Sequence, residues 1–176
     1  MKKSEKPYAF FSSLANTGSN QALEMILKGY GEPGKSSQAA FAALLSIKTF
    51  DAVYPLLDIA RTSTKTQDVS KAVDALISLI SKSDKTGIVK ANYLQELMLL
   101  AKTNKQKVTI LNQLGTTNSF QALLFIEQFL SVSELAEPAA QAGIKIALNS
   151  TEFAGSVTNR ILAKISAALT NPDAAY

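Results

Sequence analysis

The sequence predicts an all-α fold, an α-α superhelix of about five antiparallel helix pairs. Three observations predict it. Apolar residues recur at helical spacing along almost the whole chain. Short joints rich in Gly, Ser, Asn and Pro separate these stretches, and one stretch recurs later in the chain at a fixed offset. Because a single pair of short helices cannot bury its apolar stripe, neighbouring pairs must stack into one continuous core. The chain is therefore expected to be a single helical-repeat domain over residues 1–176.

The first two pairs are expected at residues 7–30 and 34–63. The stretch KPYAFFSSLAN predicts the opening helix, and NQALEMILKGY predicts its partner. The second pair combines the alanine-rich QAAFAALLSI with TFDAVYPLL. In NQALEMILKGY four apolar residues share one helical face: Leu23, Ile26, Leu27 and Tyr30.

The other three pairs are expected at residues 64–101, 104–133 and 134–170. The third joins VSKAVDALISLI to ANYLQELMLLAK, and the fourth begins with KVTILNQLG, where Gly115 is a helix stop. The fifth begins in ELAEPAAQAGIKIAL, with Pro138 in the first turn, where proline is tolerated. Its last helix carries an apolar face made of Val157, Ile161, Leu162, Ile165 and Leu169.

The internal repeat is clearest between SNQALEMIL and SFQALLFIE. The same residues recur at Ser19 and Ser119, Gln21 and Gln121, Ala22 and Ala122, and Leu23 and Leu123. The same offset also relates Ala39, Ala40 and Ala42 to Ala139, Ala140 and Ala142. Self-similarity at a fixed offset is the sequence signature of a repeat architecture.

Composition disfavours catalysis. The chain has no His, no Cys and no Trp, so it lacks the commonest general base, any thiol nucleophile and any thiolate metal ligand. We therefore expect a protein that is not an enzyme and needs no metal or cofactor. The net charge of +4 comes mainly from lysine, which predicts a solvated surface rather than a nucleic-acid partner. No apolar run reaches the roughly 20 residues of a membrane span, so no membrane insertion is expected.

The stretch GYGEPGKSS fits the pattern of a phosphate-binding loop, with Gly29, Gly34, Lys35 and Ser36 at the required places. Such a loop needs a buried strand before it, and the preceding NQALEMILK predicts a helix instead. We therefore interpret Gly29–Ser36 as a joint between helices in which Ser36 or Ser37 caps the next helix. Nucleotide binding at Gly29–Ser36 is the disfavoured alternative.

Two sets of charged residues are further, weaker candidates for a functional site. Five lysines would form a basic strip, able to contact phosphates, if they shared one edge of the stack; aromatic residues for base stacking are not interleaved with them. These are Lys85, Lys90, Lys102, Lys105 and Lys107. Glu134 and Glu137 have the spacing of a carboxylate pair, although glutamates in a first helical turn usually complement the helix dipole.

The predicted partner surface lies on the second helices in the register of the internal repeat, in which QAAFAALLSI follows SNQALEMIL and KAVDALISLI follows TFDAVYPLL. In stacked helical repeats these helices usually line the concave side, where a protein or an adjacent domain binds. The candidate residues are polar positions on these helices: Gln38, Lys71, Asp74, Ser78, Asn112, Gln141 and Lys145. They favour a non-catalytic scaffold that presents a protein-interaction or domain-docking surface.

These helix pairs resemble the HEAT/armadillo-like class of helical repeats over about residues 19–170. A narrower likeness lies in LNQLGTTNSFQALLFIEQFL, AAQAGIKIAL and the closing LTNPDAAY. These segments are similar to the helical repeat region that precedes the lectin-like domain in secreted bacterial proteins of the 3-keto-disaccharide hydrolase family. The family's catalytic residues belong to a domain that this chain lacks, so none carries over. The resemblance implies an accessory module of a carbohydrate-active protein, located in the periplasm or at the cell surface; without it we expect the cytoplasm.

Overall fold

A computed structural model describes residues 7–150 and 152–170. Of these described residues 79% are helical and none forms a strand, which confirms the all-α prediction. The predicted closing segment beyond residue 170 and the lysine before Pro7 lie outside the described residues. The chain divides into two compact units, residues 1–79 and 80–176, and each is described by itself.

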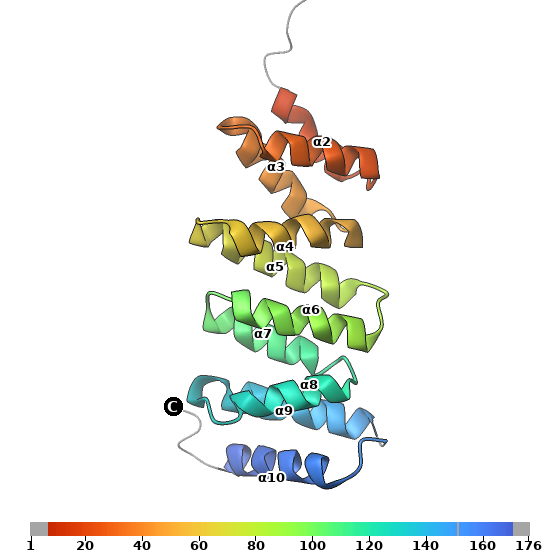
Figure 1. Ribbon diagram of the computed structural model, residues 1–176, viewed down its shortest axis with the longest axis vertical. Coiled ribbons are helices and arrows are strands. Elements are labelled where there is room, and N and C mark those ends of the chain that lie inside the picture. The colour runs from red at the N-terminus through yellow and green to blue at the C-terminus, as the bar shows by residue number, and fades with distance from the viewer. Residues whose placement is uncertain (1–6, 151, 171–176) are drawn as a thin grey trace, which may run out of the picture. The chain divides into compact units, whose positions relative to one another are not determined.

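The first unit is built around a cluster of three helices. Helices α1, α2 and α3 contact one another, and the 3-10 helix η1 lies against α3. Phe11, Ile26 and Leu44 are among the buried side chains of this cluster. The elements of the unit are η1 (Pro7–Phe10), α1 (Phe11–Ala15), α2 (Asn20–Tyr30), α3 (Lys35–Ser46), η2 (Phe50–Ala52), α4 (Val53–Thr62) and α5 (Thr66–Lys82), the last of which continues into the second unit (Figure 1).

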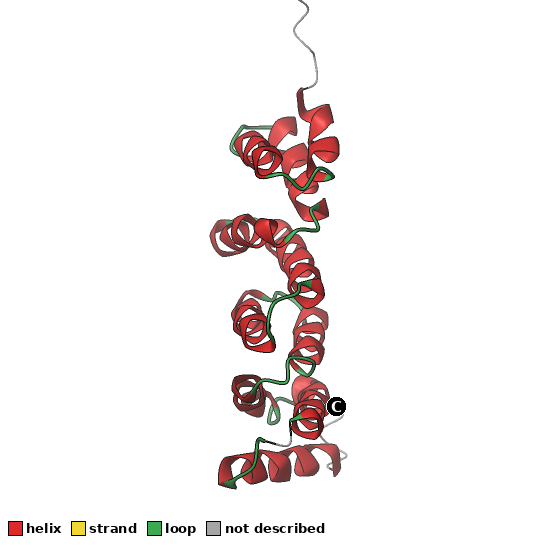
Figure 2. Ribbon diagram, turned by 90° about the vertical axis from the view of Figure 1, so that its right-hand side faces the viewer, coloured by secondary structure: helices red, strands yellow, loops and turns green. Residues whose placement is uncertain are grey.

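The second unit has two layers of helices. Helix α6 contacts α8 in one layer and α7 contacts α9 in the other, while α6 also contacts α7 and α8 contacts α9 (Figure 2). Helix α10 packs on α9 through Ile161 and Ile165. The elements are α6 (Gly87–Leu100), α7 (Asn104–Leu114), α8 (Phe120–Ile126), η3 (Glu127–Phe129), α9 (Ser133–Asn149) and α10 (Ser156–Thr170).

The sequence repeat is also a structural repeat. The Thr17 hydroxyl donates to the Leu14 carbonyl at 2.8 Å, and the Thr117 hydroxyl donates to the Leu114 carbonyl at 2.7 Å. The next residue has a positive φ in both copies, 63° at Gly18 and 47° at Asn118, as expected for Gly and Asn. Ser19 and Ser119 then occupy the N-cap positions of α2 and α8. The two copies thus share one turn, which joins α1 to α2 and α7 to α8.

Two helix starts differ from the sequence prediction. Helix α3 begins at Lys35 with Gly34 as its N-cap, so neither Ser36 nor Ser37 caps it, and the Ser36 hydroxyl instead donates to Glu32 at 3.1 Å. Pro138 lies inside α9 rather than in its first turn, because the helix begins earlier, at Ser133.

The predicted apolar face of α10 is only partly buried. Ile161 and Ile165 are buried against α9, whereas Val157, Leu162 and Leu169 are exposed by 37–45%. Helix α9 alone covers only the centre of the apolar stripe of α10. The residues at the edges of that stripe therefore stay in contact with solvent.

Candidate functional site

A groove of about 650 Å³ lies in the first unit between α3 and the start of α5. Its α3 wall consists of residues on one helical face, from Ser37 to Leu45. Gln38 and Ala42 are exposed along this wall, whereas Phe41 is 7% exposed and forms its apolar base. A volume of this size is typical of sites that bind a small molecule or a short peptide segment.

The opposite wall is polar. Gln67, Asp68 and Lys71 lie on one face of α5, and residues 62–65, from the end of α4 to the start of α5, line the groove beside them. In this connection the Ser63 hydroxyl accepts a hydrogen bond from the backbone N–H of Lys65 at 3.2 Å. This contact holds the connection in a turn directly before α5.

Tyr30, the last residue of α2, also lines the groove. Its ring contacts that of Phe41, with centroids 5.9 Å apart. Burial, together with the negative charges of Asp68 and Asp58, raises the pKa of the Tyr30 phenol above its ordinary value of 10.0. The phenol is therefore neutral at neutral pH and can donate a hydrogen bond into the groove.

The seven predicted partner-surface residues fall into three groups. Gln38 and Lys71 line the groove. Asp74 and Ser78 are exposed further along α5 and lie outside the groove lining. The other three belong to the second unit: Asn112 on α7 is half-buried, while Gln141 and Lys145 on α9 are exposed.

The groove also contains residues that sequence reasoning did not single out. The helical spacing places Tyr30 on the apolar face of α2, and no sequence pattern selects Lys65 or Asp68. The turn residues between the two predicted helices were the available signal, because side chains at helix–helix joints remain accessible.

The phosphate-loop pattern has the geometry of a helix joint. Gly29 is buried inside α2, and the residues before it are helical, which confirms the predicted helix before the motif. The backbone carbonyl of Gly29 accepts a hydrogen bond from Glu32 at 3.3 Å, as part of the turn that ends the helix. Among the described residues no strand leads into this segment.

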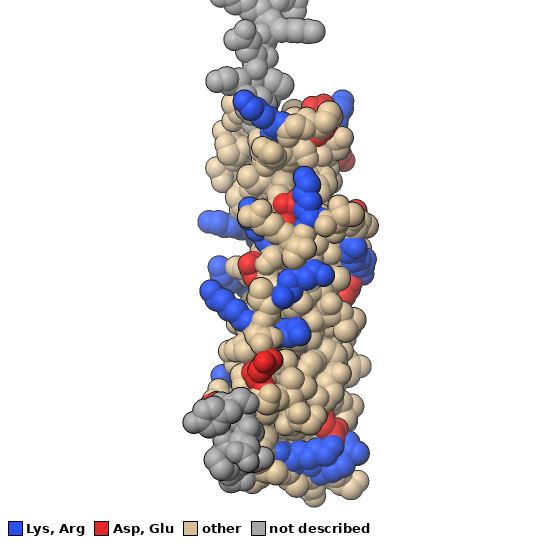
Figure 3. Space-filling model, turned by 90° about the vertical axis from the view of Figure 1, so that its left-hand side faces the viewer, with Lys and Arg blue, Asp and Glu red and all other residues tan. Residues whose placement is uncertain are grey.

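The predicted basic strip is divided by α6. Lys85 precedes this helix and Lys102 follows it, so the 14 residues of α6 separate them by about 21 Å. Lys90 lies near the start of α6, where its ammonium donates to the Ser81 carbonyl at 3.1 Å. On the face shown in Figure 3 basic side chains are dispersed among uncharged and acidic ones.

The two glutamates of α9 have separate partners. Glu134 accepts a hydrogen bond from the side-chain amide of Asn104 at 3.0 Å. Glu137 accepts one from Gln141, also at 3.0 Å. Neither contact brings the carboxylates together, so both glutamates serve as helix-surface hydrogen-bond acceptors.

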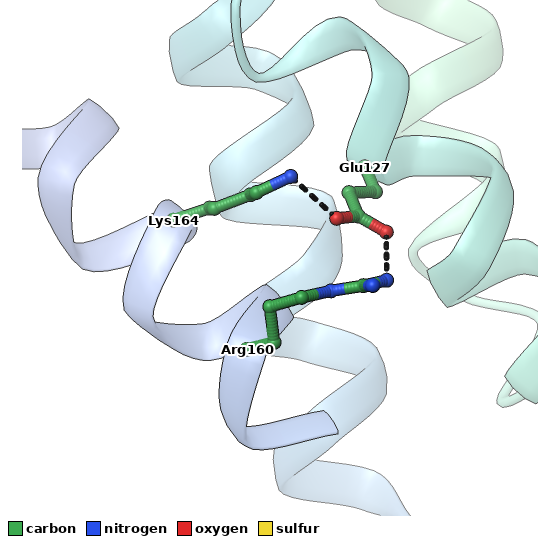
Figure 4. Close-up of polar contacts among 3 residues, drawn as sticks. All are labelled: Glu127, Arg160 and Lys164. Atoms are coloured by element: carbon green, nitrogen blue, oxygen red, sulfur yellow. Dashed lines mark hydrogen bonds and ion pairs between the residues drawn. The ribbon is translucent and has the colours of Figure 1, made fainter. Parts of the chain in front are cut away.

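One charge cluster joins two elements of the second unit. Arg160 and Lys164, one turn apart on α10, donate to the two carboxylate oxygens of Glu127 at 2.8 and 2.7 Å (Figure 4). The hydrogen bond from Lys164, with the charge of Arg160, holds the pKa of Glu127 below its ordinary value of 4.5. The cluster therefore links α10 to η3.

Other kinds of site are not found in the described part of the chain. No helix there is both long and apolar enough to cross a membrane. The same residues contain no cluster of three or more potential metal ligands. Comparisons with family models, curated proteins and solved structures find no match for this chain. The resemblances to HEAT/armadillo repeats and to the 3-keto-disaccharide hydrolase family therefore stay predictions.

Proposed function

We propose that this chain is a non-catalytic helical-repeat module that binds a segment of another protein, or of an adjacent domain, in the groove between α3 and α5. The observation that carries the proposal is the groove itself. It combines an apolar base at Phe41 with polar side chains from three helices and a connecting segment. It also contains Gln38 and Lys71, which were predicted as partner-surface residues from their places on second helices.

The arrangement of the second unit supports the architectural part of the proposal. The pairing of α6 with α8 and of α7 with α9 is the packing expected of successive units in an α-α superhelix of the HEAT/armadillo-like kind. The repeated turn at residues 17–19 and 117–119 supports the same architecture. In such proteins binding specificity resides in surface residues, so the partner is not encoded in the core.

A blocking substitution tests the proposal. Ala42 is exposed and lines the groove, so Ala42→Trp should fill the groove without disturbing the core. Ala163→Trp, at an exposed position of α10, is the matched control. Proteins captured from the source cells by the wild-type chain should be retained by the control and lost by Ala42→Trp. An identical set captured by all three chains would show that the groove is not the docking site.

A further inference from the structure

The groove offers hydrogen-bond donors that have no partner within the chain. Among the described residues, no hydrogen bond or ion pair engages the Tyr30 hydroxyl or the ammonium groups of Lys65 and Lys71. All three line the same groove. Donors that remain unpaired in the free protein are available to an acceptor supplied by a ligand.

The charge of the lining favours an anion. Lys65 and Lys71 lie three residues before and after Asp68, and Asp68 is the only carboxylate among the described lining residues. Within the lining two positive charges thus oppose one negative charge, while Asp58, outside the lining, also acts on Tyr30. A carboxylate ligand would gain from both ammonium groups and would be repelled by Asp68 and, more weakly, by Asp58.

The apolar side chains of the lining lie on the α3 wall. Phe41, Ala42 and Leu45 line the groove along this helix, opposite the charged residues of α5. The lined stretch from Ser37 to Leu45 spans eight helical steps, about 12 Å, which is the length of about four residues of extended chain.

We propose that the groove binds an extended peptide of about four residues in which an acidic side chain lies next to an apolar one. The carboxylate is held by Lys65, Lys71 and the Tyr30 hydroxyl, and the apolar side chain lies on Phe41 and Leu45. This inference rests on the proposed docking function and specifies the chemistry of the partner.

The test uses the full chain and a fluorescein-labelled hexapeptide in which glutamate alternates with leucine. Binding is measured by fluorescence anisotropy at an ionic strength of about 0.05 M, where screening is weak. Two further peptides carry glutamine or lysine in place of glutamate. Lys71→Gln should raise the Kd of the glutamate peptide about fivefold, and Asp68→Asn should lower it about two- to fivefold, as expected for exposed charge pairs.

A control in the same unit isolates the effect of position. Lys48 is exposed outside the groove, so Lys48→Gln removes the same charge and should leave the Kd unchanged. Circular dichroism of each variant checks folding. Opposite effects of Lys71→Gln and Asp68→Asn cannot both come from loss of structure.

The outcomes separate the two proposals. Tighter binding of the glutamine or lysine peptide, weaker binding by Asp68→Asn, or no binding of any peptide would overturn the acidic-peptide inference. If a non-acidic peptide binds and Ala42→Trp abolishes that binding, the docking function holds while its charge preference is refuted. If Ala42→Trp leaves all peptide binding unchanged, the groove is not the site, and both proposals fail.

Discussion

The substitution Gly29→Ala tests whether the motif glycine serves packing rather than phosphate binding. Gly29 is buried in α2 against the ring of Phe11. A Cβ atom at this position would overlap Phe11 Cζ and lie 2.7 Å from Cε2 and 3.0 Å from Cε1. Because three atoms of one buried ring are involved, rotation of a flexible side-chain end cannot relieve the contact, and the whole ring must shift.

The expected magnitude is a difference of two effects. Overpacking a core this severely lowers the free energy of unfolding by about 3 kcal/mol. Replacing glycine by alanine inside a helix raises it by about 1 kcal/mol. The net destabilisation should be about 2 kcal/mol. With an m-value of about 2 kcal/mol/M, the urea midpoint should fall by about 1 M.

Urea unfolding followed by circular dichroism at the helical band measures this shift. Gly31→Ala is the matched control in the same motif: Gly31 has a φ of −70°, and the nearest atom to its Cβ would be the Lys28 carbonyl oxygen at 3.5 Å. Its stability should stay within about 0.5 kcal/mol of wild type.

A double-mutant cycle with Phe11→Leu should recover at least about 1 kcal/mol of the loss, because the smaller side chain makes room for the Cβ. The reasoning is refuted if Gly29→Ala is as stable as Gly31→Ala, or if its effect is the same with and without Phe11→Leu.

Three further substitutions test the second unit. Gly87→Ala should destabilise it by about 3 kcal/mol or more, since the new Cβ would overlap the backbone carbonyl of Thr117; thermal melting with an unchanged midpoint would disprove this contact. Glu127→Gln should cost about 1 kcal/mol at neutral pH. The stabilisation from a lowered pKa is complete above the unfolded pKa and is lost as the pH falls through the folded pKa, so the difference from wild type should shrink as pH falls below about 4.5; a difference that persists at pH about 2 would contradict the ion-pair explanation. Thr103→Ala should cost about 1 kcal/mol because its hydroxyl caps α7, whereas Thr86, an N-cap without a side-chain hydrogen bond, should tolerate alanine; equal losses in urea unfolding would rule out the cap.

Much of the fold follows from the sequence because helical periodicity is local. Side chains three and four positions apart share a face in any α-helix, so Leu23 and Ile26 predict α2 without knowledge of its neighbours. The stop at Gly115 was also predicted, and this residue is the C-cap of α7. Pro138 was misplaced, because the start of α9 depends on residues before the apolar pattern begins.

The site was predictable only in part. Gln38 and Lys71 were identified from their expected places on second helices, and both line the groove. Tyr30 and Asp68 were not, since Tyr30 ends α2 and Asp68 lies in the first turn of α5, far apart in the chain. Nothing in either local pattern shows that the two side chains share a groove.

Local spacing in the sequence predicts the all-α class, the order of the helices and the repeat at Ser19 and Ser119, because these depend on residues close in the chain. Packing between helices decides that Gly29 lies on Phe11, that Glu127 binds two basic residues of α10, and that α3 and α5 enclose a groove. The reason is physical. Helix formation is governed by spacing along the chain, whereas a groove or an ion pair depends on which helix faces packing brings together, and many sequences with the same periodicity pack differently.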